Sequence, residues 1–241
     1  MSSAEHAILV GASKGIGREV AASFLRSGAD VTILSRTVPT HLDGAVHVEV
    51  DLSDLDGVSE VAAALAGDRP PFHNLVFLQR MRGEADDDLL RRELTVSVEA
   101  TNLLIEALTA NRPADHAGAI VIVSSLAADL VAADQPLSYH VAKAALNAMV
   151  RYYAVRLAKD RIRVNGVTPG TVLRDEARAH FRDNPAEYER RIRYTPLGRM
   201  ARADEIADVI SYLCSDRASF ITGQVVVADG GMSLMFQGTL D

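Results

Sequence analysis

Short apolar runs and longer amphipathic stretches alternate along almost the whole chain. Runs such as 7–10 and 119–123 are apolar throughout, as expected for strands buried on both faces of a parallel sheet. The predicted strands are 7–10, 31–35, 46–51, 74–78, 119–123, 162–167 and 224–228. Because helical patterns separate them, the sequence predicts an α/β fold with one seven-stranded, doubly wound parallel sheet and helices on both faces.

Apolar residues at helical spacing mark the segments between the strands. The predicted helices run from Gly17 to about Gly28, start again near Ser53, and cover 89–108, about 136–159 and 204–215. Residues 174–194 are charged, rich in arginine and interrupted by Pro185. They predict one or two helices of a substrate lid, taken as 174–197, whose arginines either meet an anionic substrate or pair with acids in the same helices. The acidic run 84–88 predicts a solvated helix start.

Composition narrows the class of protein. The 241-residue chain is 48% hydrophobic, so it can bury a large core, and we treat 1–241 as a single domain. Its formal charge of −7 argues against nucleic acid or an anionic membrane as the partner. Cys214 is the only cysteine and the seven histidines lack ligand spacing, so no disulfide and no metal site are expected. Without a signal peptide or an apolar run near ~20 residues, we expect a cytoplasmic protein.

A glycine-rich turn follows the first predicted strand and opens a helix. It reads Gly11-Ala-Ser13-Lys14-Gly15-Ile16-Gly17. Glycines allow a tight turn and let backbone N–H groups approach a pyrophosphate, and the helix N-terminus favours its negative charge. The strand–turn–helix context therefore predicts a Rossmann-type dinucleotide-binding domain, although the glycine spacing differs from the Gly-x-Gly-x-x-Gly of larger domains.

The ends of the second and third strands are expected to meet the adenosine half of a dinucleotide. Ser35, Arg36 and Thr37 stand where an acidic residue would bond a free 2′-hydroxyl. Together with Lys14 in the glycine turn, they suit a 2′-phosphate and favour NADPH over NADH, unless Arg36 is only a solvated arginine. Asp51 either accepts from the adenine amino group or caps the helix that follows.

The candidate catalytic residues are Ser125, Tyr139 and Lys143. Tyr139 and Lys143 lie four residues apart on one predicted helix, so their side chains share a face. A nearby ammonium lowers the pKa of a phenol, and such a tyrosine can pass a proton to or from a carbonyl oxygen. Ser125 ends the preceding strand, where its hydroxyl would bond the same oxygen. The alternative is a surface helix with an ordinary tyrosine and lysine.

Taken together, these motifs resemble the short-chain dehydrogenase/reductase family over nearly the whole chain. The further matching segments are Asp51-Leu52, Arg163-Val-Asn-Gly-Val-Thr-Pro169-Gly170, Pro196-Leu-Gly-Arg199, Phe220-Ile-Thr-Gly-Gln224 and Asp229-Gly-Gly231. The resemblance implies that Tyr139 is the general acid for ketone reduction, that Lys143 lowers its pKa and holds the nicotinamide ribose, and that Ser125 polarises the carbonyl. It also implies that Gly11 to Gly17 cradle the pyrophosphate. The implied cofactor-binding set further includes Leu52, Gln79, Pro169, Gly170 and Val172, with residues 169–172 lining the nicotinamide.

The sequence departs from the family pattern in two places near the fourth strand and the helix after it. The family's Asn-Asn-Ala-Gly is replaced by Phe77-Leu-Gln-Arg80, so the backbone approach that its glycine permits must change. The catalytic-helix asparagine, part of the family's proton relay, aligns with Ser97. A serine can hold a water, but with a shorter reach.

Two further departures lie around the catalytic set. Ser125 and Tyr139 are fourteen positions apart, one more than the commonest spacing, so either the loop bulges or Ser124 shares the task. The threonine usually found just after Pro-Gly aligns near Arg174, which alters the contact with the nicotinamide amide.

The leading hypothesis is an NADPH-dependent reductase that converts a small ketone or other carbonyl substrate to an alcohol, with Tyr139 as general acid. The first alternative is NADP⁺-dependent alcohol oxidation at the same site. The second is a weakly catalytic, cofactor-binding sensor or assembly protein. The family resemblance also implies a homo-oligomer, a tetramer or a dimer, built through the long helices and the C-terminal strand.

Overall fold

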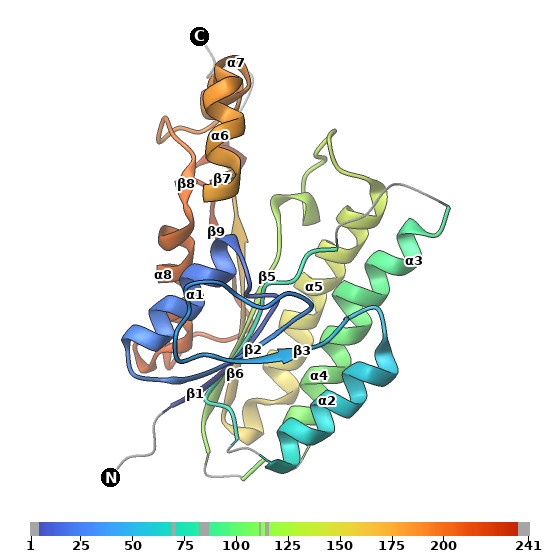
Figure 1. The fold of residues 1–241 in the computed structure, drawn as a ribbon. Coiled ribbons are helices and arrows are strands. Elements are labelled where there is room, and N and C mark those ends of the chain that lie inside the picture. Colours follow the sequence, from blue (N-terminus) through green and yellow to red (C-terminus); the bar gives the residue numbers. More distant parts are fainter. Residues whose placement is uncertain (1–4, 69–70, 82–86, 111, 114–115, 236–241) are drawn as a thin grey trace.

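A single parallel sheet forms the centre of the molecule (Figure 1). The computed structural model describes residues 5–68, 71–81, 87–110, 112–113 and 116–235. The sheet has seven strands in the order β3-β2-β1-β4-β5-β6-β9, all parallel. These strands are β1 (His6–Val10), β2 (Asp30–Ser35), β3 (Val46–Glu49), β4 (Asn74–Phe77), β5 (Gly118–Val123), β6 (Ile162–Pro169) and β9 (Val225–Ala228). The predicted fold class, strand number and strand placement are confirmed.

Helices cover both faces of this sheet. The α-helices of the described residues, including α6 and α7 beyond the sheet, are α1 (Gly15–Arg26), α2 (Leu55–Asp68), α3 (Leu89–Leu94), α4 (Ala100–Thr109), α5 (Leu137–Arg156), α6 (Asp175–Asp183), α7 (Pro185–Arg193) and α8 (Ala203–Cys214). In Figure 1, α1 and α8 lie against one face and α2 to α5 against the other. A small second sheet pairs β7 (Val172–Leu173) with β8 (Ala201–Arg202).

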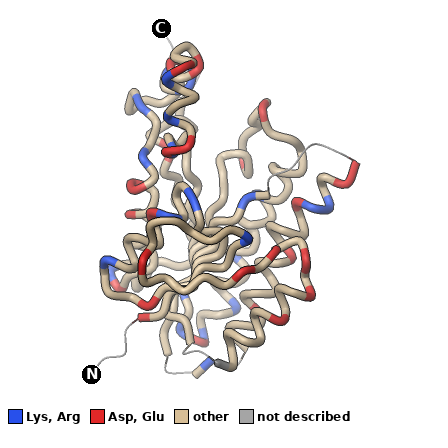
Figure 2. The backbone as a smooth tube through the Cα atoms, in the orientation of Figure 1, with Lys and Arg blue, Asp and Glu red and all other residues tan. Residues whose placement is uncertain are grey.

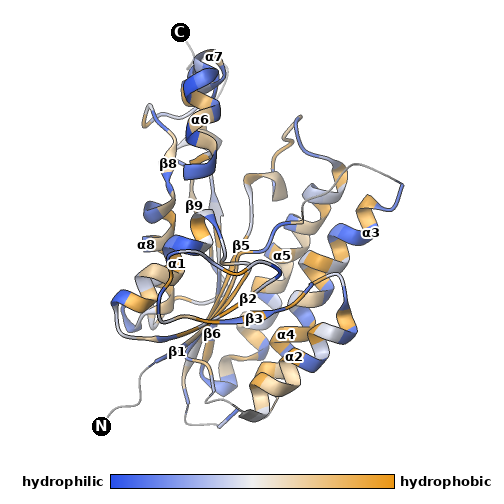
Figure 3. Ribbon diagram, in the orientation of Figure 1, coloured by the Kyte–Doolittle hydropathy of each residue, from blue (hydrophilic) through white to orange (hydrophobic). Residues whose placement is uncertain are grey.

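Two apolar clusters fill the two layers because alternate strand residues point to opposite faces. Ile8 and Val10 of β1 belong to the cluster under α2, α4 and α5, whereas Ala7 and Leu9 belong to the cluster under α1 and α8. All four side chains are buried, which explains why the strand reads as a continuous apolar run. Figure 3 shows the same contrast, with hydrophobic strands in the centre and hydrophilic residues on α6 and α7.

The helix expected over 89–108 is confirmed as unbroken, but its middle is π-helical. It consists of α3, a π-helical segment over Thr95–Glu99, and α4. The side chain of Thr101 donates to the carbonyl of Ser97 at 2.7 Å, within this segment. A single π-helical turn replaces i→i+4 by i→i+5 hydrogen bonds over a few residues only, and such turns are frequent at functional sites.

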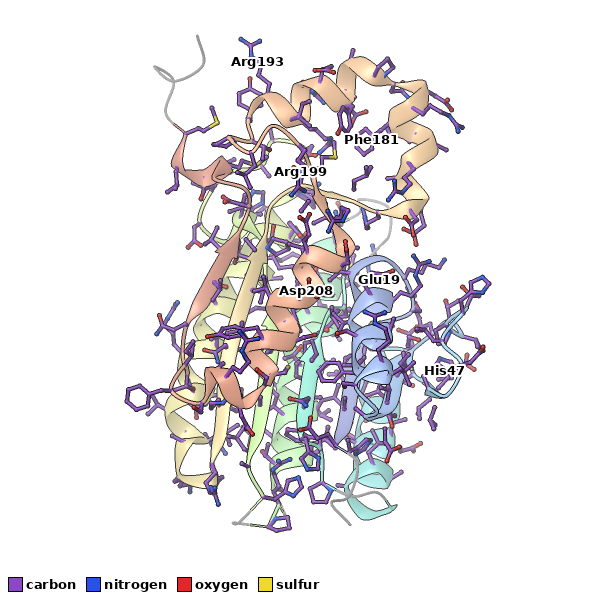
Figure 4. The ribbon with its side chains drawn as sticks, turned by 90° about the vertical axis from the view of Figure 1, so that its left-hand side faces the viewer. Glu19, His47, Phe181, Arg193, Arg199 and Asp208 are labelled. Carbon is purple, nitrogen blue, oxygen red and sulfur yellow. The ribbon has the colours of Figure 1, made fainter. Side chains whose placement is uncertain are left out.

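The lid region forms two helices, α6 and α7, beyond the carboxyl ends of the strands (Figure 1). Charged side chains of both signs are interspersed on both helices (Figure 2). Most of them pair locally; examples are Arg178 with Asp175 at 2.9 Å and Arg191 with Glu187 at 2.9 Å. Figure 4 shows the two helices from the side, with Phe181 on α6 and Arg193 at the end of α7.

The remaining sequence expectations concern the acidic run 84–88, membrane-spanning helices and metal sites. Of the acidic run 84–88, residues 84–86 lie outside the described part of the chain, and 87–88 form a turn before α3. No helix in the described ranges is long and apolar enough to span a bilayer. Within those same ranges, no cluster of three or more histidine, cysteine or acidic side chains is arranged to hold a metal ion.

Candidate active site

The glycine-rich turn joins β1 to α1 and leaves no space for a side chain at Gly11 or Gly17. Gly11 has a φ of 79°, and a Cβ there would lie 2.7 Å from the backbone N and Cα of Gln79. A Cβ on Gly17 would lie 2.5 Å from the Cα of Ala12. Both positions therefore require glycine. No side chain caps the first turn of α1, whose N-cap is Lys14, so its N–H groups remain available to an anion.

The start of the lid reaches over this turn. A Cβ on Gly15 would lie 3.0 Å from the Cδ of Arg174, so the Arg174 side chain runs along the turn. Asp175, the first residue of α6, accepts a hydrogen bond from Arg18 on α1. The lid is thus tied by an ion pair to the helix that the glycine turn begins.

The second strand ends in residues with different roles. The Ser35 hydroxyl is buried, donates to the Thr37 carbonyl at 2.8 Å and lies 3.2 Å from the His47 Nε2. Arg36 is exposed, and one of its nitrogens lies 4.0 Å from an Asp51 oxygen. Of this group, Arg36 is therefore the exposed charged side chain, while Ser35 shapes the loop.

Asp51 follows the third strand, and the sequence left two roles open for it, a contact with adenine and a helix cap. Asp51 accepts from the backbone N–H and the hydroxyl of Ser53, at 3.0 and 2.8 Å, and these bonds lower the pKa of its carboxyl. Asp54 accepts from the Gly57 N–H at 3.2 Å and so caps α2. Because Asp54 fills the capping role, Asp51 keeps its second oxygen toward Arg36. The Leu52 side chain belongs to the apolar core.

Tyr139 and Lys143 lie side by side on α5, as the sequence predicts. The Lys143 Nζ lies 5.6 Å from the centre of the Tyr139 ring and donates to the Val123 carbonyl at 3.1 Å. Lys143 is completely buried, and this desolvation lowers its pKa from 10.5 to about 8. Smaller effects come from Glu93, which raises that pKa, and from Arg80, which lowers it. Lys143 is therefore a buried cation that remains mostly protonated at neutral pH.

The two serines after β5 divide their roles. The Ser124 hydroxyl is buried and donates to the Lys143 carbonyl at 3.3 Å, which anchors α5 to the strand end. The Ser125 hydroxyl accepts from the Ala127 N–H at 3.2 Å, so its own proton remains available. Ser125 is therefore the better candidate to donate to a substrate oxygen.

Arg80, in the loop after β4, is a second cation beside Tyr139. Its guanidinium carbon lies 5.1 Å from the centre of the Tyr139 ring, and Nη2 donates to Gln135 at 2.8 Å. The sequence places Arg80 where the family has a small residue, and the structure places it at the mouth of the site.

A buried polar chain links this loop to α3. Gln79 donates to the Thr101 hydroxyl at 2.6 Å, and Thr101 donates to the Ser97 carbonyl. The Ser97 hydroxyl in turn donates to the Glu93 carboxylate at 2.8 Å. The Gln79 Oε1 is buried without a hydrogen-bond partner among the described residues.

A cleft of about 740 Å³ connects several of these groups. It is lined by Lys14, Arg80, Met81, Leu89, Glu93, Asp134, Gln135, Pro136, Tyr139, Arg174, Glu176 and Ala177. Of the predicted site residues it brings together Lys14 and Tyr139, whereas Arg36, Thr37 and Asp51 lie apart at the end of β2 and β3. Another hollow of similar volume, between α2, α4 and α5, holds none of the predicted residues.

Comparison with known proteins gives concordant results. A family model described as Enoyl-(Acyl carrier protein) reductase matches residues 11–233. D-erythrulose reductase from Gallus gallus is 34% identical over 93% of this chain and 94% of that protein. L-xylulose reductase from Caenorhabditis elegans is 31% identical over 94% of each chain. The solved structure of the TT0495 protein from Thermus thermophilus is 32% identical, has a TM-score of 0.83, and is matched over 98% of this chain and 100% of that one.

The chain belongs to the short-chain dehydrogenase/reductase family. Membership makes it an oxidoreductase that uses a nicotinamide cofactor. The residues present fit such a cofactor, because the Gly11 and Gly17 positions form a side-chain-free cradle at the N-terminus of α1. The Ile16 side chain, by contrast, packs into the apolar layer under α1, and Ser13 contributes backbone to the turn.

In this short-chain dehydrogenase/reductase, the C-terminal motifs hold one another in place. A Cβ on Gly170 would lie 2.7 Å from the Cα of Asp229, so the Pro169-Gly170 turn and the end of β9 touch. Asp229 accepts from the Gly231 and Ser233 N–H groups at 2.8 and 2.7 Å. The Val172 side chain packs into the core. The glycine of this motif thus allows the turn to pack against the end of β9.

The cleft residues that were not singled out as site residues from the sequence include three acidic ones, Glu93, Asp134 and Glu176. Glu93 carries a detectable signal, an acidic residue four positions before Ser97, at the helical spacing of the inward face. Glu176 sits among many lid acids and carries no distinguishing pattern.

Proposed function

We propose that this chain is an NADPH-dependent reductase that converts a small hydroxylated ketone to the corresponding alcohol. The observation that carries the proposal is the Tyr139 ring flanked by two cations, with Lys143 at 5.6 Å and Arg80 at 5.1 Å, on the wall of a cleft. A phenol in this setting is suited to give up its proton, because nearby positive charge stabilises the oxygen that remains.

The nicotinamide cofactor supplies the hydride when it is bound. Tyr139 donates its phenolic proton to the substrate oxygen as the carbonyl carbon is reduced, and the negative charge left on Tyr139 lies beside Lys143. Ser125 donates a hydrogen bond to the same substrate oxygen and orients the carbonyl. Lys143 would bind the cofactor ribose. It would also stabilise the negative charge that remains on Tyr139.

The polar lining of the cleft supports a hydroxylated substrate. Asp134, Gln135 and Glu176 add acceptors and donors around Tyr139. Relatives of this chain are named D-erythrulose reductase and L-xylulose reductase, and both of these names denote reductases of hydroxylated ketones. NADPH is preferred in the proposal because Arg36 is exposed at the end of β2 and Lys14 at the start of α1.

Alcohol oxidation is the second candidate, since the same site runs in either direction. Another relative is named galactitol 2-dehydrogenase, for the oxidation of a polyol. A cofactor-binding sensor is the third. It has no use for a fully buried lysine beside a tyrosine, and the cost of burying that charge weighs against it.

The test is NADPH consumption with a panel of small ketoses and other ketones. Tyr139→Phe should lower kcat by at least about 100-fold with little change in NADPH affinity, because the general acid is lost and the ring is kept. Tyr152→Phe, an exposed tyrosine on the same helix, is the matched control and should behave as the parent. Tight NADPH binding without turnover of any ketone, and without oxidation of the matching alcohols by NADP⁺, would favour the sensor.

A further inference from the structure

Glu93 is an acidic side chain in the interior of the helical layer. It lies on α3, is only 4% exposed, and lines the cleft that also contains Tyr139. Burial of a carboxylate is costly unless hydrogen bonds or an opposite charge compensate it. Its presence beside the reacting group therefore calls for a partner.

One compensation is a hydrogen bond within the same helix. The Ser97 hydroxyl donates to the Glu93 Oε1 at 2.8 Å. Ser97 is completely buried, and it stands in the π-helical segment at the position of the family's relay asparagine. The serine hydroxyl is thus directed at the carboxylate.

The other compensation is the Lys143 ammonium. The Lys143 ammonium donates to the Val123 carbonyl and lies 5.6 Å from the centre of the Tyr139 ring. Glu93, on α3 packed against α5, and Arg80, in the loop after β4, line the cleft beside Tyr139 and act on the ammonium electrostatically. Glu93 is the one anion among these groups. Its field opposes both the desolvation of Lys143 and the repulsion by Arg80.

We propose that Glu93 is a positioning residue that acts through Lys143, its carboxylate oriented by Ser97 so that the buried ammonium stays protonated beside Tyr139. The proposal rests on the proposed function, since a charged Lys143 matters because it stabilises the charge left on Tyr139. Without Glu93, a larger share of Lys143 would be neutral at pH 7 to 8, and the tyrosine would lose that support as pH rises.

A direct test uses the small number of lysines. The chain contains three, Lys14, Lys143 and Lys159, so a protein labelled with ¹³C at the lysine ε-carbon gives three NMR signals, which Lys14→Arg and Lys159→Arg assign. Glu93→Gln, which keeps the acceptor for Ser97, should lower the pKa of Lys143 by about one unit. Glu99→Gln, an exposed acid of the π-helical segment, is the control and should leave it unchanged.

Two further variants test how the groups around Lys143 set its pKa. Ser97→Ala should shift the Lys143 titration in the same direction by less, because the carboxylate is retained but no longer held. Arg80→Gln should shift it in the opposite direction, since a positive neighbour is removed. An unchanged Lys143 titration in Glu93→Gln would overturn the proposal. If Glu93→Gln does not fold, an unchanged titration in Ser97→Ala would overturn it instead.

The kinetic arm separates this proposal from the proposed function. For ketone reduction, the alkaline limb of the kcat/KM profile of Glu93→Gln should move to lower pH by about one unit, with activity near pH 6 little changed. A purely structural role would lower kcat/KM equally at every pH, and that outcome would contradict the proposal. Failure of the parent protein to reduce any ketone would remove the reductase, whereas the NMR titration would still decide how Glu93 acts on Lys143.

Discussion

At the scale of single residues, burial of the Lys143 ammonium lowers the folding stability of the protein. Burial lowers its pKa from 10.5 to about 8, which corresponds to a cost of about 3 kcal/mol while both folded and unfolded forms carry the proton. That cost is present at neutral pH and is relieved as pH rises through about 8, where the folded form releases its proton first. A methionine would fill the same volume without this penalty, so retention of lysine points to its role beside Tyr139.

Arg36 carries the residue-scale prediction about the cofactor. Arg36→Asp should reduce the preference for NADPH over NADH, measured as the ratio of kcat/KM values, by at least about tenfold, because a carboxylate repels the 2′-phosphate and accepts from a free 2′-hydroxyl. Arg26→Asp, an exposed arginine at the end of α1, is the charge-matched control. An unchanged ratio in Arg36→Asp would show that the 2′-phosphate is held elsewhere.

At the scale of elements, the lid is attached to the nucleotide-binding turn. Asp175 opens α6 and pairs with Arg18 of α1, while Arg174 lies along Gly15. The π-helical segment performs a comparable task on the other side of the cleft, where it directs Ser97 toward Glu93. In both cases a short segment between regular helices sets the direction of a site residue.

The lid attachment gives the element-scale prediction. Arg18→Gln should raise the KM for NADPH by at most about fivefold and speed proteolysis within 174–194, because a partly exposed ion pair contributes only about 1 kcal/mol or less. Arg182→Gln removes an exposed pair with Asp183 inside the lid and serves as the control. Equal proteolysis of both variants would show that the Arg18 contact does not hold the lid.

At the scale of the whole molecule, one helix presents apolar side chains outward. Leu137, Tyr152 and Val155 of α5 are 73%, 58% and 81% exposed, although the inner face of the same helix is fully packed. Tyr153 on that inner side is fixed by hydrogen bonds to Asn102 and Glu106 at 2.6 and 2.7 Å. A rigid helix with an exposed apolar face is suited to contact another copy of the chain.

The whole-molecule prediction is therefore a homo-oligomer. Light scattering should give a mass above 25.9 kDa for the parent, and Val155→Asp should shift the distribution toward the monomer because it places a charge in the apolar contact. Arg26→Asp, at the exposed end of α1 on the opposite face of the sheet, is the control and should leave the mass unchanged. A monomeric parent protein would contradict the prediction.

The sequence by itself determined the layers and the main motif positions. Apolar runs bounded by glycine or polar residues fix strands buried on both faces, and seven of them were placed correctly. The four-residue spacing of Tyr139 and Lys143 fixes their shared helical face, because spacing on a helix is a local property. The same logic located the glycine turn before α1.

Only the tertiary structure decided which charges meet. Arg80, Glu93 and Lys143 come from three separate segments, and their mutual influence depends on distance and burial, which no local pattern encodes. Likewise, Ser124 and Ser125 are adjacent in sequence, yet one anchors α5 and the other keeps its proton. Electrostatic effects act through space and strengthen where water is excluded, so the chemistry of this site emerged only when the helices had packed on the sheet.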